Sequence, residues 1–378
     1  MNIQDTSMLQ PRPYRSIAVI GAGSWGTALA AAAARAGCAV RLHARRGEVA
    51  DDINASRRNR AYLGDATLSA NIEASTNLAH VLEGADAVLL VIPSSAIRDT
   101  ARSMAPLMRA GALAATPVVT CAKGVEAQSG MLLVDVVREE MPGQPVAILS
   151  GPTFADEVAV DMPTTVTIAS DRVPEDPLER GIAARLALTM SSGGFRAYIS
   201  DDTTGVGIGG AMKNVIAIAC GISRGAGFRA NMTAALITRG LAEMTLLATV
   251  LGGRADTIAG LSGLGDLTLT CSSEQSRNLR FGLQLGAGAR REQTFGGAPV
   301  VVEGVRNAVS VTDLARKHGL ALAICEAVRA IVHDGADIVA TLGDLWAQPI
   351  EAEAQEINVA FRHPDPAMVR EKIKEMIG

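Results

Sequence analysis

The sequence predicts an α/β protein in which a doubly wound, mostly parallel sheet is followed by an all-helical domain. The chain has 378 residues, which is long enough for two domains. In its first half short β-rich runs alternate with helical patterns, whereas strand-like runs nearly vanish after Asp202. We therefore expect an N-terminal tail over residues 1–15, a sheet domain over 16–202 and a helical domain over 203–378. A functional site is expected in the cleft between the two domains.

The expected strands are short runs, and many of them end at a Gly, Pro or Ser. They cover residues 17–20, 39–43, 87–92, 118–122, 146–150, 164–169 and 195–199. The early runs are apolar on both faces, as in a parallel sheet that helices cover on both sides. Such a sheet usually binds its ligand at the carboxyl ends of the strands.

The expected helices follow from apolar periodicity and from start and stop residues. An Ala-rich helix should run from the Ser24 region to about Ala36, with Gly37 as its stop. In the second half Asn231 is a reasonable N-cap and Gly252 a reasonable C-terminal stop. Helical patterns there cover residues 209–220, 231–251, 275–285, 305–318, 321–333 and 366–377.

Composition excludes several classes of protein. Hydrophobic residues make up 48% of the chain, which excludes bulk disorder, and a net charge of −4 without a basic block argues against nucleic-acid binding. The five cysteines show no CxxC spacing, which indicates reduced, structural thiols and a cytoplasmic protein. No export signal and no apolar run of ~18 residues is visible, so membrane insertion is not expected. No residue cluster suggests a metal site.

A glycine pattern predicts a dinucleotide site. Gly21, Gly23 and Gly26 form GxGxxG directly after an apolar strand and at the start of the Ala-rich helix. The first glycine permits the tight turn, the second lets a pyrophosphate approach the backbone, and the third lets helix and strand pack closely. The helix N-terminus offers free N–H groups to the phosphates. We therefore expect a Rossmann-type, dinucleotide-binding domain over 16–202; the alternative is a Gly-rich turn without a ligand.

The next strand ends in residues that select the cofactor. An acidic residue there would bind the ribose 2′-hydroxyl of NAD. This chain has His43, Ala44, Arg45 and Arg46, with no acid before Glu48. Two guanidinium groups suit a 2′-phosphate, so NADP(H) is predicted as the preferred cofactor and NAD(H) as the second. The alternative is a solvated basic loop that is indifferent to the phosphate.

Two lysines and one carboxylate form the expected catalytic set. Only five of the 35 basic residues are lysines, and Lys123 and Lys213 lie in apolar, Gly-flanked segments. Asp266 stands among small apolar residues, and Ser-Arg-Asn at 276–278 begins a helix. Arg277 could hold a substrate phosphate, and a lysine could protonate the oxygen that hydride attack leaves negative. Asp266 could orient a lysine; a structural ion pair between Lys213 and Asp266 is the alternative.

These segments together resemble the NAD(P)-dependent glycerol-3-phosphate dehydrogenase family, bacterial biosynthetic branch. The similarity covers roughly residues 16–335 and includes GAGSWGTALA, AKGVE, SGPTFADEV, GGAMKNVIAI, GLGDLTLTC, SRN and VVEGVR. It implies interconversion of dihydroxyacetone phosphate and sn-glycerol 3-phosphate for glycerophospholipid synthesis. It also implies that Lys213 accepts the proton in alcohol oxidation, and therefore donates it in ketone reduction. Homodimerisation is an expectation of the family alone.

The resemblance assigns further contacts, residue by residue. The implied substrate contacts are Lys123, Gly151, Thr153, Lys213, Asp266, Ser276, Arg277 and Asn278. The implied cofactor contacts are Ser24, Trp25, Arg45, Lys123, Ala155, Arg277, Val301 and Glu303. Thr153 replaces the serine of many members but keeps the hydroxyl, and the His-Ala-Arg-Arg loop departs from the common pattern.

Two other functions stay open from the sequence. Another two-domain β-hydroxyacid or opine-type dehydrogenase would share both domains but would have no use for the Ser-Arg-Asn phosphate clamp. A non-catalytic NADP-binding sensor would lack proton donors, yet Lys123, Lys213 and Asp266 are all present.

Overall fold

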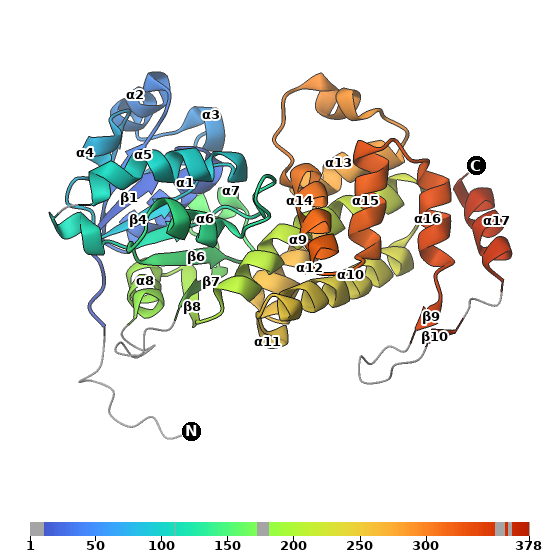
Figure 1. Cartoon of the computed structure of the whole chain (residues 1–378). Helices are drawn as coiled ribbons and strands as arrows, with labels where there is room; N and C mark the ends of the chain where they lie inside the picture. Colours follow the sequence, from blue (N-terminus) through green and yellow to red (C-terminus); the bar gives the residue numbers. More distant parts are fainter. Residues whose placement is uncertain (1–10, 110, 172–180, 352–359, 362–364, 378) are drawn as a thin grey trace. The chain divides into compact units, whose positions relative to one another are not determined.

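The computed structural model describes residues 11–109, 111–171, 181–351, 360–361 and 365–377 (Figure 1). The chain forms two compact units, each described by itself below. The first unit comprises residues 1–210 and 248–266, and the second comprises 211–247 and 267–378. Of the expected N-terminal tail, residues 1–10 lie outside the described residues. The predicted boundary between 202 and 203 stays a prediction.

The first unit is built on one eight-stranded sheet. Its spatial order is β3-β2-β1-β4-β5-β6-β7-β8. The strands are β1 (Ser16–Ile20), β2 (Ala39–His43), β3 (Ile72–Ser75), β4 (Ala87–Leu90), β5 (Val118–Thr120), β6 (Val146–Ser150), β7 (Thr164–Ser170) and β8 (Phe195–Ser200). The first six are parallel, whereas β7 runs antiparallel to β6 and β8 runs parallel to β7. The expected doubly wound sheet is confirmed.

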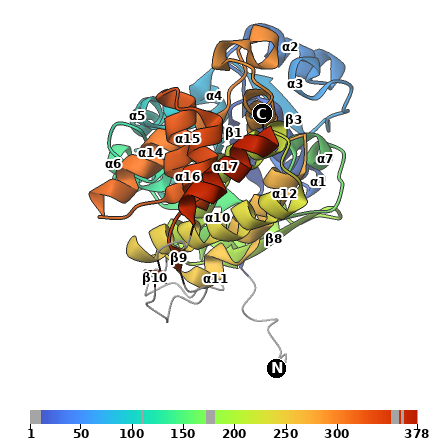
Figure 2. The same cartoon turned by 90° about the vertical axis from the view of Figure 1, so that its right-hand side faces the viewer.

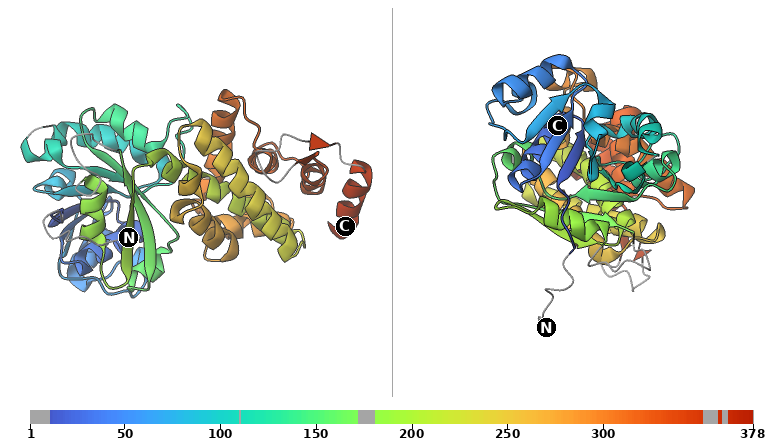
Figure 3. Two further views of the ribbon diagram at one scale, coloured as in Figure 1. Left: turned by 90° about the horizontal axis from the view of Figure 1, so that it is seen from below. Right: turned by 90° about the vertical axis from the view of Figure 1, so that its left-hand side faces the viewer.

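Helices cover both faces of this sheet (Figure 3, left). They are α1 (Ser24–Arg35), α2 (Gly47–Ser56), α3 (Arg60–Leu63), α4 (Leu78–Leu82), α5 (Ile97–Met108), α6 (Leu133–Glu140), α7 (Ala155–Ala159), α8 (Ile182–Met190) and α11 (Ala255–Ile258), with shorter turns η1 (Ser94–Ala96), η2 (Gly111–Ala115) and η3 (Leu261–Gly265). Helix α1 packs against α7 and α8, while α5 packs against α4 and α6. Helix α1 ends at Arg35 and Gly37 follows with φ +93°, so the predicted stop is confirmed.

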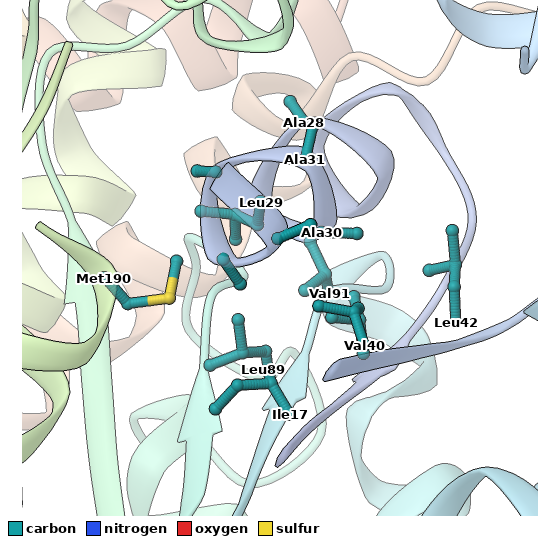
Figure 4. Packing of buried hydrophobic residues seen from close by; sticks show 14 of the residues in the cluster. Ile17, Ala28, Leu29, Ala30, Ala31, Val40, Leu42, Leu89, Val91 and Met190 are labelled. Atoms are coloured by element: carbon teal, nitrogen blue, oxygen red, sulfur yellow. The ribbon is translucent and has the colours of Figure 1, made fainter. Parts of the chain in front are cut away.

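Small side chains on α1 let this helix lie close to the sheet. Every residue from Gly26 to Ala34 is buried. Leu29 lies in one cluster with Ile17 of β1, Leu89 of β4 and Met190 of α8 (Figure 4). Close packing of this kind fixes the start of α1, and with it the GxGxxG turn, against the ends of β1 and β4.

Among its described residues, the second unit is helical apart from two short antiparallel strands. Its elements are α9 (Thr203–Gly225), which begins in the first unit, α10 (Ala230–Val250), α12 (Asp266–Ser272), α13 (Arg277–Gly286), η4 (Arg291–Gly297), α14 (Glu303–Lys317), α15 (Ala323–His333), α16 (Ile338–Trp346), β9 (Ile350–Glu351), β10 (Ala360–Phe361) and α17 (Pro366–Ile377). Helices α14, α15 and α16 lie side by side (Figure 2). All six expected helices are present, which confirms the helical C-terminal half.

Two details of the sequence prediction need correction. Helix α10 begins at Ala230, so Asn231 lies inside its first turn and is not the N-cap. The helical pattern over 209–220 predicts Lys213 near the start of its helix, but α9 already begins at Thr203 and Lys213 lies at its middle. The expected stop at Gly252 is confirmed, because α10 ends at Val250 and Gly252 has φ +87°.

Glycines bring α9 and α13 into backbone contact. A Cβ on Gly221 of α9 would lie 2.3 Å from the carbonyl oxygen of Leu279, and one on Gly282 of α13 would lie 2.2 Å from that of Ile218. One turn further along, Gly286 approaches α9 in the same way. Only glycine fits at these positions, so α13 is fixed along α9 and its first residues are placed beside the middle of that helix.

Among the described residues, two helices, α9 and α10, are long and apolar enough to cross a membrane by length and composition alone. The relevant stretch of α9 is entirely buried inside the protein, as in a core helix, while 28% of the stretch in α10 is buried.

A partly buried carboxylate caps a helix in the second unit. Glu243 of α10 accepts hydrogen bonds from the backbone N–H groups of Ile324 (2.7 Å) and Cys325 (3.4 Å). These N–H groups belong to the first turn of α15 and have no partner within the helix. The N-cap residue Leu322 has no polar side chain that could bind them. Burial raises the pKa of Glu243 to about 7, although the two backbone hydrogen bonds oppose the shift.

We expect the stability of the protein to fall with rising pH because of Glu243. The folded state binds this proton more tightly than the unfolded chain, so the free energy of unfolding should decrease between pH 4.5 and about 7 and then level off. The contribution is on the order of 3 kcal/mol. Urea unfolding of the wild type and of Glu243→Gln at several pH values measures it.

Glu243→Gln keeps an acceptor for Ile324 but cannot ionise, so this part of the pH dependence should disappear. Glu292→Gln, a change at an exposed position of η4, is the control and should follow the wild type. Parallel curves for Glu243→Gln and the wild type would contradict the assignment.

Candidate functional site

The three glycines of the GxGxxG turn have different surroundings. Gly21 has φ +118°, and a Cβ there would lie 2.3 Å from the carbonyl oxygen of Val91. A Cβ on Gly26 would lie 1.7 Å from the carbonyl oxygen of Gly21. Both glycines are therefore required by packing. A Cβ on Gly23 would meet no atom within 4 Å, so this residue leaves open space at the N-terminus of α1, where a phosphate could approach.

Helix α3 lies against this turn and brings in a residue that the sequence analysis missed. The Ser24 hydroxyl donates a hydrogen bond to the carbonyl oxygen of Tyr62 (2.9 Å). The Arg46 guanidinium lies 5.5 Å from the centre of the Tyr62 ring. Tyr62 thus connects the glycine turn with the basic loop after β2. Trp25, the next residue of α1, packs against the core of the first unit.

The two arginines of the basic loop are not equivalent. Arg46 forms a salt bridge with Glu48 (3.1 Å) in addition to its contact with Tyr62. Arg45 is exposed and has no ion-pair or hydrogen-bond partner among the residues that the structure describes. Burial lowers the pKa of His43, so His43 adds no charge at neutral pH. Arg45 therefore carries the uncompensated positive charge of this loop.

The ammonium group of Lys123 binds two oxygen acceptors in the first unit. Its Nζ lies 2.5 Å from Oδ2 of Asp266 and donates to the carbonyl oxygen of Gly151 at 3.1 Å. Asp266 is fully buried and follows the π-helical turn η3. A Cβ on Gly210 would lie 3.2 Å from Cγ of Lys123, so glycine leaves room for the lysine. The sequence left open which lysine Asp266 orients, and the structure brings Lys123 and Asp266 together.

The loop after β6 also lies next to the ammonium group of Lys123. A Cβ on Gly151 would lie 2.8 Å from Cα of Val166, so Gly151 allows the close approach of β7. The Thr153 hydroxyl donates to the carbonyl oxygen of Gly151 at 3.4 Å. Ala155 begins α7 and packs against the core. The substrate contacts implied at Gly151 and Thr153 therefore lie next to the Lys123 ammonium.

The second lysine lies in the second unit. Lys213 is buried, with 7% of its surface exposed, and its Nζ donates a hydrogen bond to the Thr270 hydroxyl (2.7 Å). Thr270 was not predicted, although it stands four residues after Asp266 on α12, where helical neighbours share a face. The structure thus fixes the Nζ of Lys213 against a hydroxyl of α12.

The Ser-Arg-Asn segment forms the N-terminus of α13, as predicted. The Ser276 hydroxyl caps the helix by accepting from the N–H of Leu279 at 3.2 Å. Asn278 donates to Oδ1 of Asn214 on α9 (2.9 Å) and accepts from the N–H of Gly304 on α14 (2.9 Å). Asn278 thus ties three helices together at this point.

Arg277 is the first residue of α13 and remains accessible to solvent. Surrounding protein atoms lower the pKa of its guanidinium, while the charge of Glu303 opposes this shift. The group still stays protonated at neutral pH. Glu303 begins α14, and Val301, two residues before it, is exposed. The implied cofactor residues Val301 and Glu303 and the implied phosphate ligand Arg277 therefore belong to the ends of two neighbouring helices.

Comparison with known proteins identifies the family. Residues 16–175 match the family model of the NAD-dependent glycerol-3-phosphate dehydrogenase N-terminus, and residues 202–342 match that of its C-terminus. A glycerol-3-phosphate dehydrogenase [NAD(P)+] of Caulobacter vibrioides is 46% identical over 341 residues, which cover 90% of this chain and 99% of the relative. One from Maricaulis maris is 43% identical over 340 residues, or 90% and 98% of the two chains.

A solved structure supports the same assignment. The crystal structure of glycerol-3-phosphate dehydrogenase from Coxiella burnetii aligns with a TM-score of 0.81 at 38% identity, covering 88% of this chain and 99% of that one. Both halves of the chain, the motifs that carry the resemblance and the three-dimensional fold agree with each other. The chain belongs to the NAD-dependent glycerol-3-phosphate dehydrogenase family.

Proposed function

We propose that this protein reduces dihydroxyacetone phosphate to sn-glycerol 3-phosphate, reversibly and with NADPH preferred over NADH, for glycerophospholipid synthesis. The observation that carries the proposal is the hydrogen bond between buried Lys213 and Thr270, which holds a proton donor in place. Family membership supports the substrate, and the relatives from Caulobacter and Maricaulis are named for the same activity.

The residues present fit a nicotinamide dinucleotide. Open space at Gly23 and the free N–H groups of α1 suit a pyrophosphate, and the exposed Arg45 suits a 2′-phosphate. When bound, the cofactor supplies the hydride. We assign Ser24, Trp25, Arg46 and the other implied contacts to binding of the same molecule.

Residues of the protein then protonate the carbonyl oxygen of the substrate and bind its phosphate. Lys213 donates a proton to the carbonyl oxygen as negative charge develops there, and Thr270 orients its Nζ. Lys123 holds substrate and cofactor, while Asp266 fixes its ammonium and offsets part of its charge. Arg277 and the N–H groups at the start of α13 bind the substrate phosphate.

We further propose a cytoplasmic homodimer that does not insert into a membrane. All five cysteines are free and buried, which suits a reducing compartment. The dimer rests on the family alone.

The test of the function is NADPH oxidation, followed by absorbance, with dihydroxyacetone phosphate or with unphosphorylated dihydroxyacetone. Fast turnover of the phosphate ester and slow turnover of the free ketone are expected, because the free ketone has no phosphate for Arg277 to bind. Equal rates would contradict the phosphate clamp, and no turnover of either compound would contradict the proposed reaction.

The basic loop should set the cofactor preference. We expect Arg45→Ala to raise the Michaelis constant for NADPH and leave that for NADH nearly unchanged, since one charge-assisted contact to the 2′-phosphate is worth ~1.5–3 kcal/mol. Arg46→Ala should have a smaller effect, because Arg46 already pairs with Glu48. Steady-state kinetics with both cofactors measures this. Equal losses for NADPH and NADH would mean that the loop has another role.

A further inference from the structure

A cluster of five charged side chains lies beside the segment that carries Lys123. We call it the Arg98 cluster; its members are Arg98 and Arg102 of α5, Glu126 of the loop after β5, and Glu139 and Glu140 of α6. One edge of the Arg98 guanidinium binds both carboxylate oxygens of Glu126, with Nε donating to Oε1 at 2.9 Å and Nη2 to Oε2 at 2.7 Å. Its Nη1 also binds Glu139 and Glu140, each at 2.6 Å.

Glu126 is fixed through its main chain as well. Its N–H donates to the carbonyl oxygen of Met131 and its carbonyl oxygen accepts from the N–H of Gly130, both at 2.9 Å. The Ser129 hydroxyl donates to its carboxylate at 2.6 Å. Just before it, Val125 pairs with Leu132 in an isolated bridge. The chain therefore has a rigid anchor at Glu126.

Lys123 lies between this anchor and the end of β5. Strand β5 ends at Thr120, so Lys123 is three residues from a fixed strand on one side and three from Glu126 on the other. A free lysine side chain samples many rotamers, and holding its ammonium at one point requires a fixed backbone beneath it. The bidentate fork of Arg98 gives such geometric precision, because two parallel hydrogen bonds define an orientation.

We propose that Glu126 is a positioning residue that acts through its salt bridge with Arg98. It fixes the backbone at Lys123, so that the Nζ of Lys123 reaches Asp266 and the carbonyl oxygen of Gly151. The effect on catalysis rests on the proposed function, in which Lys123 touches substrate and cofactor. The effect on the geometry of Lys123 does not depend on that function. The competing explanation is that the Arg98 cluster only joins α5 to α6.

Glu126 and Glu140 offer a matched comparison. Both carboxylates bind Arg98, and 14% of each side chain is exposed. Hydrogen bonds from arginine lower the pKa of both groups, from Arg98 for Glu126 and chiefly from Arg102 for Glu140. Only Glu126 lies on the Lys123 loop. Glu126→Gln leaves Arg98 with two carboxylates, so α5 and α6 stay paired, while the loop keeps its main-chain hydrogen bonds and loses only its ion pair with Arg98.

The experiment compares the full-length wild type, E126Q and E140Q. The first readout is the acetylation rate of Lys123 by acetic anhydride, followed by mass spectrometry, which is simple because the chain has only five lysines. We expect Lys123 to react several times faster in E126Q and at the wild-type rate in E140Q. The second readout is kinetics with dihydroxyacetone phosphate, where kcat/KM should fall about tenfold or more in E126Q only, as expected for a displaced contact group.

The outcomes separate this proposal from the proposed function. Equal Lys123 acetylation in E126Q and E140Q would overturn the positioning role. A wild type without activity would overturn the proposed function, and acetylation alone would then decide the positioning role. If E126Q does not fold, Glu126→Asp takes its place, because it keeps the charge but shortens the reach to Arg98.

Discussion

Replacement of Lys213 by methionine should lower turnover by ~100-fold or more, because the developing alkoxide loses its proton donor. Methionine fills a similar volume at this buried position, so the fold should persist. Binding of NADPH should also persist, since the cofactor contacts expected in the first unit are unchanged. Cofactor binding by fluorescence and turnover by absorbance are measured on the same preparation.

Two further variants test the chemistry of this result. Lys213→Arg should not restore activity, because a guanidinium keeps its proton too tightly at neutral pH. Lys317→Met changes an exposed lysine of α14 and should behave as the wild type. Substantial activity in Lys213→Arg would assign the proton transfer elsewhere, with Lys123 as the next candidate.

Arg277→Leu should weaken productive binding of dihydroxyacetone phosphate by ~100-fold, because a charge-assisted, bidentate contact to the phosphate is lost. The slow rate with unphosphorylated dihydroxyacetone should hardly change, since this ketone has no group for Arg277 to bind. The Michaelis constants and kcat/KM values for the two substrates measure this difference.

Arg280→Leu is the matched control for this prediction. Arg280 lies on the same helix, and its guanidinium stacks 5.6 Å from the centre of the Phe295 ring. Losing it should affect both substrates little. If Arg277→Leu slows both substrates equally, Arg277 serves the cofactor or the structure instead of the phosphate.

Most strands were predictable because a parallel sheet needs apolar residues on both faces. Seven of the eight strands of the large sheet coincide with predicted runs. The missed strand, β3, is Ile-Glu-Ala-Ser at the edge of the sheet, and only Ile72 and Ala74 are buried. Two apolar side chains in four residues give too weak a pattern to separate a strand from a loop.

The start of α9 shows where local propensity misleads. Glycines at 205, 207, 209 and 210 disfavour a helix, yet α9 begins at Thr203. The Asp202 carboxylate caps this helix by accepting from the N–H of Gly205 at 2.7 Å. The glycines are needed for packing, since a Cβ on Gly209 would lie 2.6 Å from the carbonyl oxygen of Ser262. Tertiary contacts here outweigh the propensity.

The family, the α/β class, the helical second half and the glycine turn could all be predicted from the amino-acid sequence, because these features depend on residue types at short, regular spacings. Three contacts became clear only in the folded protein: Asp266 pairs with Lys123, Thr270 holds Lys213, and Arg46 but not Arg45 pairs with Glu48. Lys123 and Asp266 are 143 residues apart in the chain. No local pattern encodes such a pairing, because the packing of many intervening elements determines which polar groups meet.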